Sequence, residues 1–224
     1  MSWKMVWSLV PFASPWMAWN LLLAAIPLGL SEGLVRSAQW PWGVQGAIAL
    51  GLVLFLPNAP YVLTDLIHLV QEIQWHDSLL YNTLVLLPKY TLFVLLGFEA
   101  YVVAVLNVGR YLDQHQWTRW VFPVELALHG LSSLGVYLGR IERFNSWDVV
   151  TQPWPILHRM ATQLMTERSL VFIGVGFGVI TLLYGGLKQV TTALQLQYVY
   201  NQLCRQAAAT QAEPPSLAAM KPWP

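Results

Sequence analysis

Residues 90–108 read YTLFVLLGFEAYVVAVLNV, an apolar run with a single charged side chain, Glu99, near its middle. A transmembrane helix needs about 20 predominantly apolar residues to cross the hydrocarbon core of a bilayer. The run has this length and character, so it predicts a helix that spans a membrane. The carboxyl group of Glu99 would then lie at membrane depth, where ionisable side chains are costly and usually have a partner.

The composition of the whole chain agrees with this reading. Of its 224 residues, 56% are hydrophobic and 10% are charged, against about 25% charged residues in an average soluble domain. This composition excludes an ordinary soluble domain and an intrinsically disordered chain. The net charge of +1 offers no basic field for nucleic acid, and the single cysteine, Cys204, excludes an internal disulfide. The expected environment is a lipid bilayer.

Four further segments are apolar enough to be membrane spans. They are Pro15–Val35, Trp42–Leu56, Arg119–Gly139 and Leu170–Leu187. With residues 90–108 they predict an all-α fold, a polytopic membrane helix bundle of about five transmembrane helices plus short interfacial helices. We expect residues 1–206 to form a single transmembrane helical domain and residues 207–224 to form a flexible polar C-terminal tail. The expected location is a bacterial cytoplasmic (inner) membrane or a related internal membrane.

Glycines in two of these spans predict close helix packing. Gly135 and Gly139 in the fourth span, and Gly174 and Gly178 in the fifth, have the spacing that lets two backbones approach closely. We interpret these glycines as packing faces and not as a ligand site.

Three ionisable side chains within the predicted spans form a candidate intramembrane polar group: Glu99, Glu125 and His129. A hairpin that turns near Gln114 would bring Glu99 and His129 to the same depth, so we expect a hydrogen bond between them. Glu125 lies one helical turn before His129 on the same face, which continues to Ser132, Ser133 and Arg140. The group fits a structural polar seam, or a proton relay or ion-coordinating site. No fourth ligand is evident, so no metal is predicted.

A second polar group is expected at the membrane surface, after the segment PNAP (residues 57–60) interrupts the second span. Thr64 is placed to cap a short helix that follows. Along that helix, Asp65, His68, Glu72 and His76 form one polar stripe. An amphipathic helix in the membrane interface explains the stripe, and a metal or acid–base site is the alternative.

The fourth span ends in a segment with both signs of charge, which contains Arg140, Arg143, Asn145 and Asp148. Two spans separate it from Asp65, so both lie on the same side of the membrane. We therefore expect Asp65 to contact Arg140 or Arg143, and Asn58 and Asn145 to hydrogen-bond backbone freed by the helix breaks. The arginines have two possible roles: they snorkel to the headgroup layer, or they grip the phosphate of a lipid-linked substrate.

The two segments LFLPNAPYVLTDLIHL (residues 54–69) and GVYLGRIERFNSWDVV (residues 135–150) resemble the signature segments of an uncharacterised bacterial multi-pass membrane family, domain of unknown function 1361 (DUF1361). The resemblance covers nearly the whole chain. Its positions are Pro57, Asn58, Pro60, Tyr61, Asp65 and His68 in the first segment, and Gly139, Arg140, Arg143, Asn145, Ser146, Trp147 and Asp148 in the second. The family implies no established activity, but it favours these two segments as the working site.

Three functions remain open from the sequence. The first is a non-enzymatic bundle, either a small carrier or a subunit of a larger membrane assembly; it is favoured because the sequence contains no Walker A, HExxH, GxSxG or CxxC motif. The second is an intramembrane enzyme acting on a phosphate-bearing lipid, with Asp65 and His68 for acid–base chemistry. The third is a pigment- or haem-associated protein with His68 or His129 as an axial ligand. The sequence leaves the cofactor open.

Overall fold

The computed structural model describes residues 14–75, 77–141, 151, 154 and 166–210. The described residues are almost entirely helical, without a strand. In chain order the main elements are α2 (Pro15–Arg36), α3 (Trp42–Phe55), α4 (Asn58–Tyr61), the 3₁₀ helix η2 (Val62–Asp65), α5 (Leu66–Trp75), α6 (Leu79–Tyr81), the π-helical η3 (Asn82–Leu86), α7 (Leu87–Gln114), α8 (Val121–Arg140) and α11 (Glu167–Thr210). Short 3₁₀ helices, η1 (Ser37–Gln39) and η4 (Thr118–Trp120), lie at the turns.

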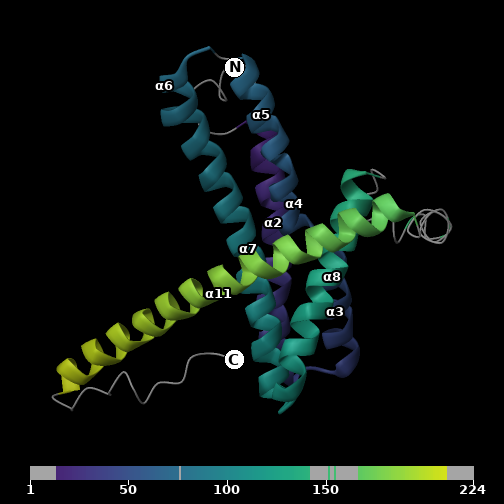
Figure 1. The fold of residues 1–224 in the computed structure, drawn as a ribbon. Helices are drawn as coiled ribbons and strands as arrows, with labels where there is room; N and C mark the ends of the chain where they lie inside the picture. Colours follow the sequence, from purple (N-terminus) through teal and green to yellow (C-terminus); the bar gives the residue numbers. More distant parts are fainter. Residues whose placement is uncertain (1–13, 76, 142–150, 152–153, 155–165, 211–224) are drawn as a thin grey trace, which may run out of the picture.

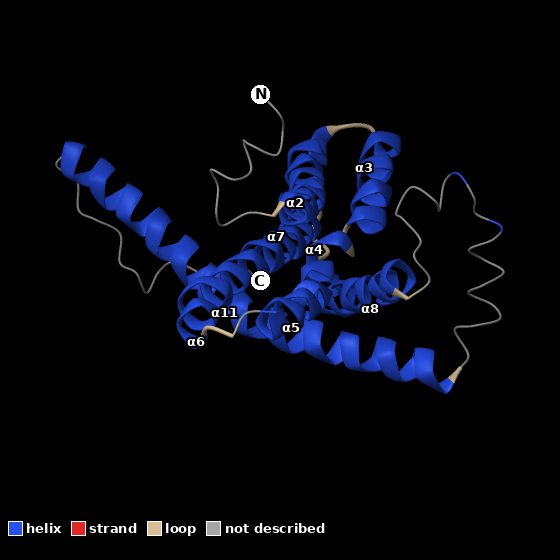
Figure 2. Ribbon diagram, turned by 90° about the horizontal axis from the view of Figure 1, so that it is seen from above, coloured by secondary structure: helices blue, strands red, loops and turns tan. Residues whose placement is uncertain are grey.

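Five helical segments in the described part are long and apolar enough to cross a membrane. The predicted membrane helix bundle is therefore confirmed. In Figure 1, α2, α7 and α8 run alongside one another with the α3–α5 segment, while α11 crosses them obliquely. The view from above shows the same crossing, with the C-terminal end of α11 reaching beyond the other helices (Figure 2).

Helix α7 forms the centre of the bundle. In the most apolar window of its span 61% of the residues are buried, against 11% in that of α11. The side chains that α7 buries include small ones such as Ala104 and Val105, which allow neighbouring helices to approach. A buried hydrogen bond from Asn107 Nδ2 to Ser31 Oγ (3.1 Å) ties α7 to α2, so the amide has a partner inside the bundle.

The second span differs from the prediction. The chain turns at Leu56 and Pro57 but continues as helix through α4, η2 and α5, so that residues 42–75 form one bent helical segment. Thr64 does not cap a new helix, because its hydroxyl donates to the carbonyl of Tyr61 (2.7 Å). Asp65 is buried instead of lying on an exposed stripe, because the 3₁₀ turn directs it toward α2 and α8.

Helix α11 is longer than the predicted fifth span. It has 44 residues, which correspond to about 66 Å at 1.5 Å per residue, roughly twice the thickness of the hydrocarbon core. The helix ends at Thr210, so it includes the first residues of the segment predicted as a tail. The polar residues after Lys188 did not end the helix because glutamine, alanine and leucine are all good helix formers.

Three glycines lie where helices approach most closely. A Cβ at Gly97 would come within 2.6 Å of Val62 Cγ1, one at Gly135 would collide with Pro57, and one at Gly176 would meet Ser133 Oγ at 2.5 Å. The prediction is therefore right for Gly135. It is wrong for Gly174 and Gly178, where a Cβ would meet no atom of the described residues within 4 Å, and Gly176 makes the close approach between them.

We predict that Gly97→Ala destabilises the bundle by about 1–3 kcal/mol, the usual cost of overpacking, because Val62 is fully buried and cannot move aside. The matched control is Gly130→Ala, where a Cβ meets nothing within 4 Å and helix propensity alone favours alanine by about 1 kcal/mol. Denaturant unfolding of the purified variants in detergent measures both. Equal stability of the two variants would contradict the packing argument.

Candidate functional site

Helix α8 carries a polar seam along one face, made of Glu125, His129, Ser133, Tyr137 and Arg140. Steps of four, four, four and three residues keep these side chains on one stripe of the helix. The first four are buried, and each side chain of the seam contacts another element. The stripe therefore forms a continuous polar interface inside an otherwise apolar bundle.

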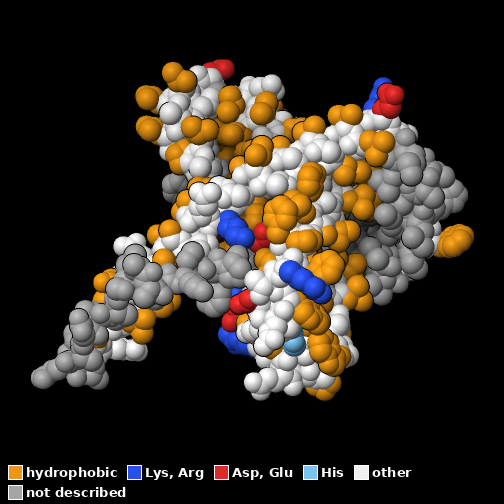
Figure 3. Space-filling model, turned by 60° about the horizontal axis from the view of Figure 1, so that its bottom comes forward, with side chains coloured by type: hydrophobic (Ala, Val, Ile, Leu, Met, Phe, Trp, Pro, Cys, Tyr) orange, Lys and Arg blue, Asp and Glu red, His pale blue; other side chains and the backbone are white. Residues whose placement is uncertain are grey.

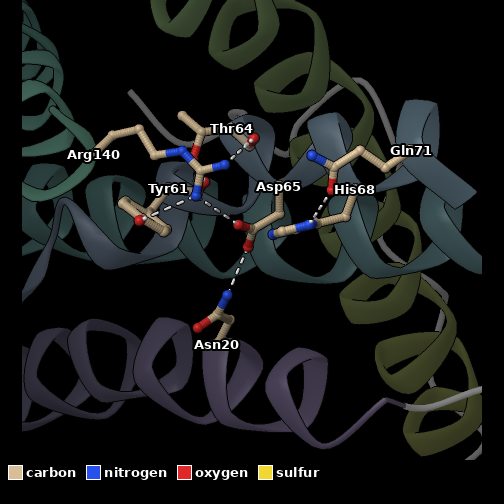
Figure 4. A network of polar contacts seen from close by, with 7 residues as sticks. All are labelled: Asn20, Tyr61, Thr64, Asp65, His68, Gln71 and Arg140. Carbon is tan, nitrogen blue, oxygen red and sulfur yellow. Dashed lines mark hydrogen bonds and ion pairs between the residues drawn. The ribbon is translucent and has the colours of Figure 1, made fainter.

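At one end of the polar seam, Arg140 meets the carboxylate of Asp65. Arg140 Nη1 lies 3.5 Å from Asp65 Oδ1, and Asn20 Nδ2 of α2 donates to Asp65 Oδ2 at 2.6 Å. Figure 4 shows the carboxylate between these two groups. Asp65 is only 2% exposed, and a buried carboxylate is tolerated when it is paired and hydrogen-bonded. The predicted contact between Asp65 and Arg140 is present.

The guanidinium of Arg140 has further partners on the bent second segment. Its Nη2 donates to the backbone carbonyl of Thr64 (3.3 Å), and its Nη1 donates to Tyr61 Oη (3.4 Å). It also lies over the Tyr61 ring, 5.8 Å from the ring centroid (Figure 4). The change from α to 3₁₀ geometry leaves backbone carbonyl groups without a helical hydrogen bond at this point. The guanidinium of Arg140 donates to one of them, the carbonyl of Thr64.

The other predicted surface residues have separate partners. His68 Nδ1 lies 3.2 Å from Gln71 Oε1, and the His68 ring lies 4.8 Å from that of Trp16, centroid to centroid. Asn58 Nδ2 donates to the carbonyl of Phe55 (3.0 Å) at the helix break, as predicted. The predicted site residues Arg143, Asn145 and Asp148 lie outside the described residues, as does His76 of the stripe.

At the other end of the polar seam, Glu125 joins α8 to α11. Glu125 Oε1 accepts hydrogen bonds from Tyr184 Oη (2.6 Å) and from Lys188 Nζ (2.8 Å). One turn further along, His129 Nδ1 lies 2.6 Å from Tyr101 Oη of α7. The ion pair and the two tyrosine hydroxyls satisfy polar groups that would be costly at membrane depth.

The predicted hydrogen bond between Glu99 and His129 is wrong. Glu99 Oε1 accepts from Thr191 Oγ1 of α11 at 2.7 Å, while His129 pairs with Tyr101. Two residues along a helix correspond to about 200° of rotation. Tyr101 therefore faces His129 while Glu99 points to the other side of α7. The hairpin turn itself falls at residues 115–117, next to the predicted point near Gln114.

Two clefts flank the crossing of α8 and α11. The first, here called the polar cleft, has a volume of about 650 Å³ and is lined by Glu125, His129, Tyr184, Lys188 and Thr192 among mainly apolar side chains such as Phe122. The second, here called the apolar groove, also has about 650 Å³ and lies between α11 and the Pro60–Thr64 segment. Figure 3 shows hydrophobic side chains over much of one face, with the few charged ones in small groups of both signs.

The described residues offer no group of three or more His, Cys, Asp and Glu side chains that could hold a metal ion. Glu125 and His129 share the polar cleft, but the third carboxylate, Glu99, faces away from His129 because it bonds to Thr191. In the described part, Glu125 and His129 act as hydrogen-bonding groups, Glu125 with Tyr184 and Lys188 and His129 with Tyr101.

Comparison with known proteins places the chain in a family. A family model described as "Protein of unknown function (DUF1361)" matches residues 19–182. The chain belongs to the DUF1361 family. No curated protein and no solved structure matches it. The DUF1361 match includes Asn20, Asp65, Glu125 and Arg140, and it ends before Tyr184 and Lys188, which complete the polar cleft.

Sequence reasoning missed several partners in both networks. Asn20 had a detectable signal, because it is the one strongly polar side chain in the apolar run from residue 15 to residue 30. Lys188 directly follows the predicted fifth span, Leu170–Leu187, where a charged side chain is common and predicts no partner inside the bundle. Tyr101 and Tyr184 gave no signal, since tyrosines are common in membrane helices and their hydroxyl partners depend on helix rotation.

We predict that Arg140→Met destabilises the protein by about 2–3 kcal/mol, because it leaves the buried carboxylate of Asp65 without its cation. The control is Arg36→Met, which breaks the exposed pair with Glu32 and should change stability by less than about 0.5 kcal/mol. Thermal and denaturant unfolding in detergent measure the difference. Adding Asp65→Leu to Arg140→Met should recover part of the loss, and equal losses for the two arginine variants would speak against the buried pair.

Proposed function

We propose that this DUF1361 protein is a non-enzymatic membrane carrier that holds a small polar solute in the polar cleft. The observation that carries the proposal is the Glu125–Lys188 pair in a cleft of about 650 Å³ with otherwise mainly apolar walls. Small-molecule sites typically have volumes of about 300–1,000 Å³ and a few converging polar groups on an apolar lining. Ionisable side chains inside membrane segments commonly mark solute and proton pathways.

The polar groups of the cleft retain hydrogen-bonding capacity for a solute. Both donors to Glu125 bond to the same carboxylate oxygen, Oε1, so Oε2 takes part in neither bond. Lys188 uses one of its three ammonium donors on Glu125. One acceptor and two donors thus remain for a solute that enters the cleft, and a zwitterion or a hydroxylated solute has the complementary groups.

The way α11 is attached also supports a carrier. In its most apolar window only 11% of the residues are buried, and polar contacts to α7 and α8 hold it in place, among them Thr191 with Glu99 and Gln195 with Arg110. Hydrogen bonds between membrane helices are worth roughly 1 kcal/mol each, so α11 can shift at modest cost. A carrier needs such a movable wall to expose its site alternately to the two sides.

The enzyme hypothesis receives less support from the same geometry. Acid–base chemistry at Asp65 would require a free carboxylate beside His68, whereas the carboxylate of Asp65 is engaged by Asn20 and Arg140 and His68 bonds to Gln71. We therefore propose a structural role for the Asp65 network and place solute binding in the polar cleft.

The test is a ligand screen followed by transport. Purified protein in lipid nanodiscs is heated with panels of zwitterionic amino acids, dicarboxylates and sugars, and unfolding is followed by tryptophan fluorescence. A ligand at 100 times its Kd stabilises the folded state by about 2.7 kcal/mol, so one class should raise Tm by several degrees. The stabilising solute, radiolabelled, should then show counterflow in proteoliposomes.

We predict that Glu125→Gln and Lys188→Met each weaken binding of that solute by at least about tenfold, since each removes a charge that faces it. Glu32→Gln is the matched control, because Glu32 belongs to an exposed ion pair away from the cleft. A flat response of the wild type to every class, or equal Tm shifts in Glu125→Gln and Glu32→Gln, would refute the carrier proposal.

A further inference from the structure

The apolar groove lies on the other side of the α8–α11 crossing from the polar cleft. Three valines of α11, Val171, Val175 and Val179, line it at intervals of four residues, and they remain exposed. The opposite wall consists of Leu63 from η2 and Val136 from α8. An exposed apolar channel of this kind is energetically favourable only when apolar atoms fill it.

The length of the groove along α11 matches one lipid chain. Its lining runs from Glu167 to Ile180, which is about 20 Å at 1.5 Å per residue. One leaflet of the hydrocarbon core is about 15 Å thick, half of the whole core. A single acyl chain that lies along α11 therefore fills the groove from end to end.

The two ends of the groove differ in polarity. Val179 and Ile180 form one end, whereas Glu167, Arg168 and Thr64 line the other. Arg168 is exposed and makes no ion pair with the described residues. A guanidinium at the polar end of an apolar channel suits a phosphate group attached to an acyl chain.

We propose that the apolar groove is a binding site for one phospholipid, with an acyl chain along Val171, Val175 and Val179 and its phosphate at Arg168. The groove and the polar cleft share no lining residue, so this proposal can be tested independently of the carrier proposal. The bound lipid completes the wall between α11 and η2, where the described side chains leave a gap of about 650 Å³.

The experiment is native mass spectrometry of the full chain in mild detergent, titrated with 1-palmitoyl-2-oleoyl-phosphatidylglycerol. We expect one molecule to bind at least about tenfold more tightly than any further ones. The same measurement with 1-palmitoyl-2-oleoyl-glycerol, which has the chains but no phosphate, should give at least about tenfold weaker binding. If the wild-type protein binds the two lipids equally, the proposed phosphate site is overturned. This comparison requires no variant protein.

Two pairs of variants locate the lipid. Val175→Trp fills the groove, and its control Leu182→Trp adds the same side chain to an exposed position of α11 outside it. Arg168→Gln removes the cation, and its control is Arg205→Gln on the same helix. We expect the first of each pair to bind the phospholipid at least about fivefold more weakly than its control. Equal binding within either pair overturns the proposal.

Discussion

Glu125 accepts two hydrogen bonds from α11, and the position of that helix depends on this interaction and on the others along the polar seam. Lipid tails are as apolar as leucine, so burying apolar surface gives membrane helices no driving force to associate. In the most apolar window of α11 only 11% of the residues are buried. Its attachment therefore rests on the packing of Ile180 and Tyr184 in the core, on the close approach of Gly176 to Ser133 and above all on polar contacts. Besides the two bonds to Glu125, the polar contacts of α11 include four hydrogen bonds. They join Ser133 to the carbonyl of Ile173, Tyr137 to Ser169, Glu99 to Thr191 and Arg110 to Gln195.

The Asp65 network applies the same constraint to the first, second and fourth helical segments. The carboxylate accepts a hydrogen bond from Asn20 of α2 and forms an ion pair with Arg140 of α8. One buried anion thus holds together three parts of the chain that are far apart in sequence. The bend at residues 56–65 brings Asp65 inward and also places Pro57 against Gly135. Replacing any one of these groups leaves another polar group without its partner in a poorly solvated place. This accounts for the mixture of helix types around Asp65: the backbone departs from regular α geometry where a charge has to be buried.

The polar residues of α8 could be predicted from the sequence because their spacing along one helix is a local property. The contact of Asp65 with Arg140 could also be predicted, since counting spans placed both on the same side. It is harder to predict which side chains pair between two helices. The pairing of His129 with Tyr101 instead of Glu99 depends on the rotation of α7, and a shift of two residues reverses the face. The continuation of α11 past Lys188 had no hydrophobic signal, because its polar half retains helix propensity without apolar periodicity. The family match names the DUF1361 family but supplies no activity that would settle the roles of these residues.

The two clefts have a common wall. Residues 167–180 of α11 line the apolar groove and residues 181–196 line the polar cleft, with the close contact of Gly176 and Ser133 near the boundary. The proposed acyl chain would contact the N-terminal half of α11, and the proposed solute would contact the C-terminal half. The polar contacts of Tyr184, Lys188 and Thr191 all lie on that second half, so the two proposed sites use different parts of one long helix.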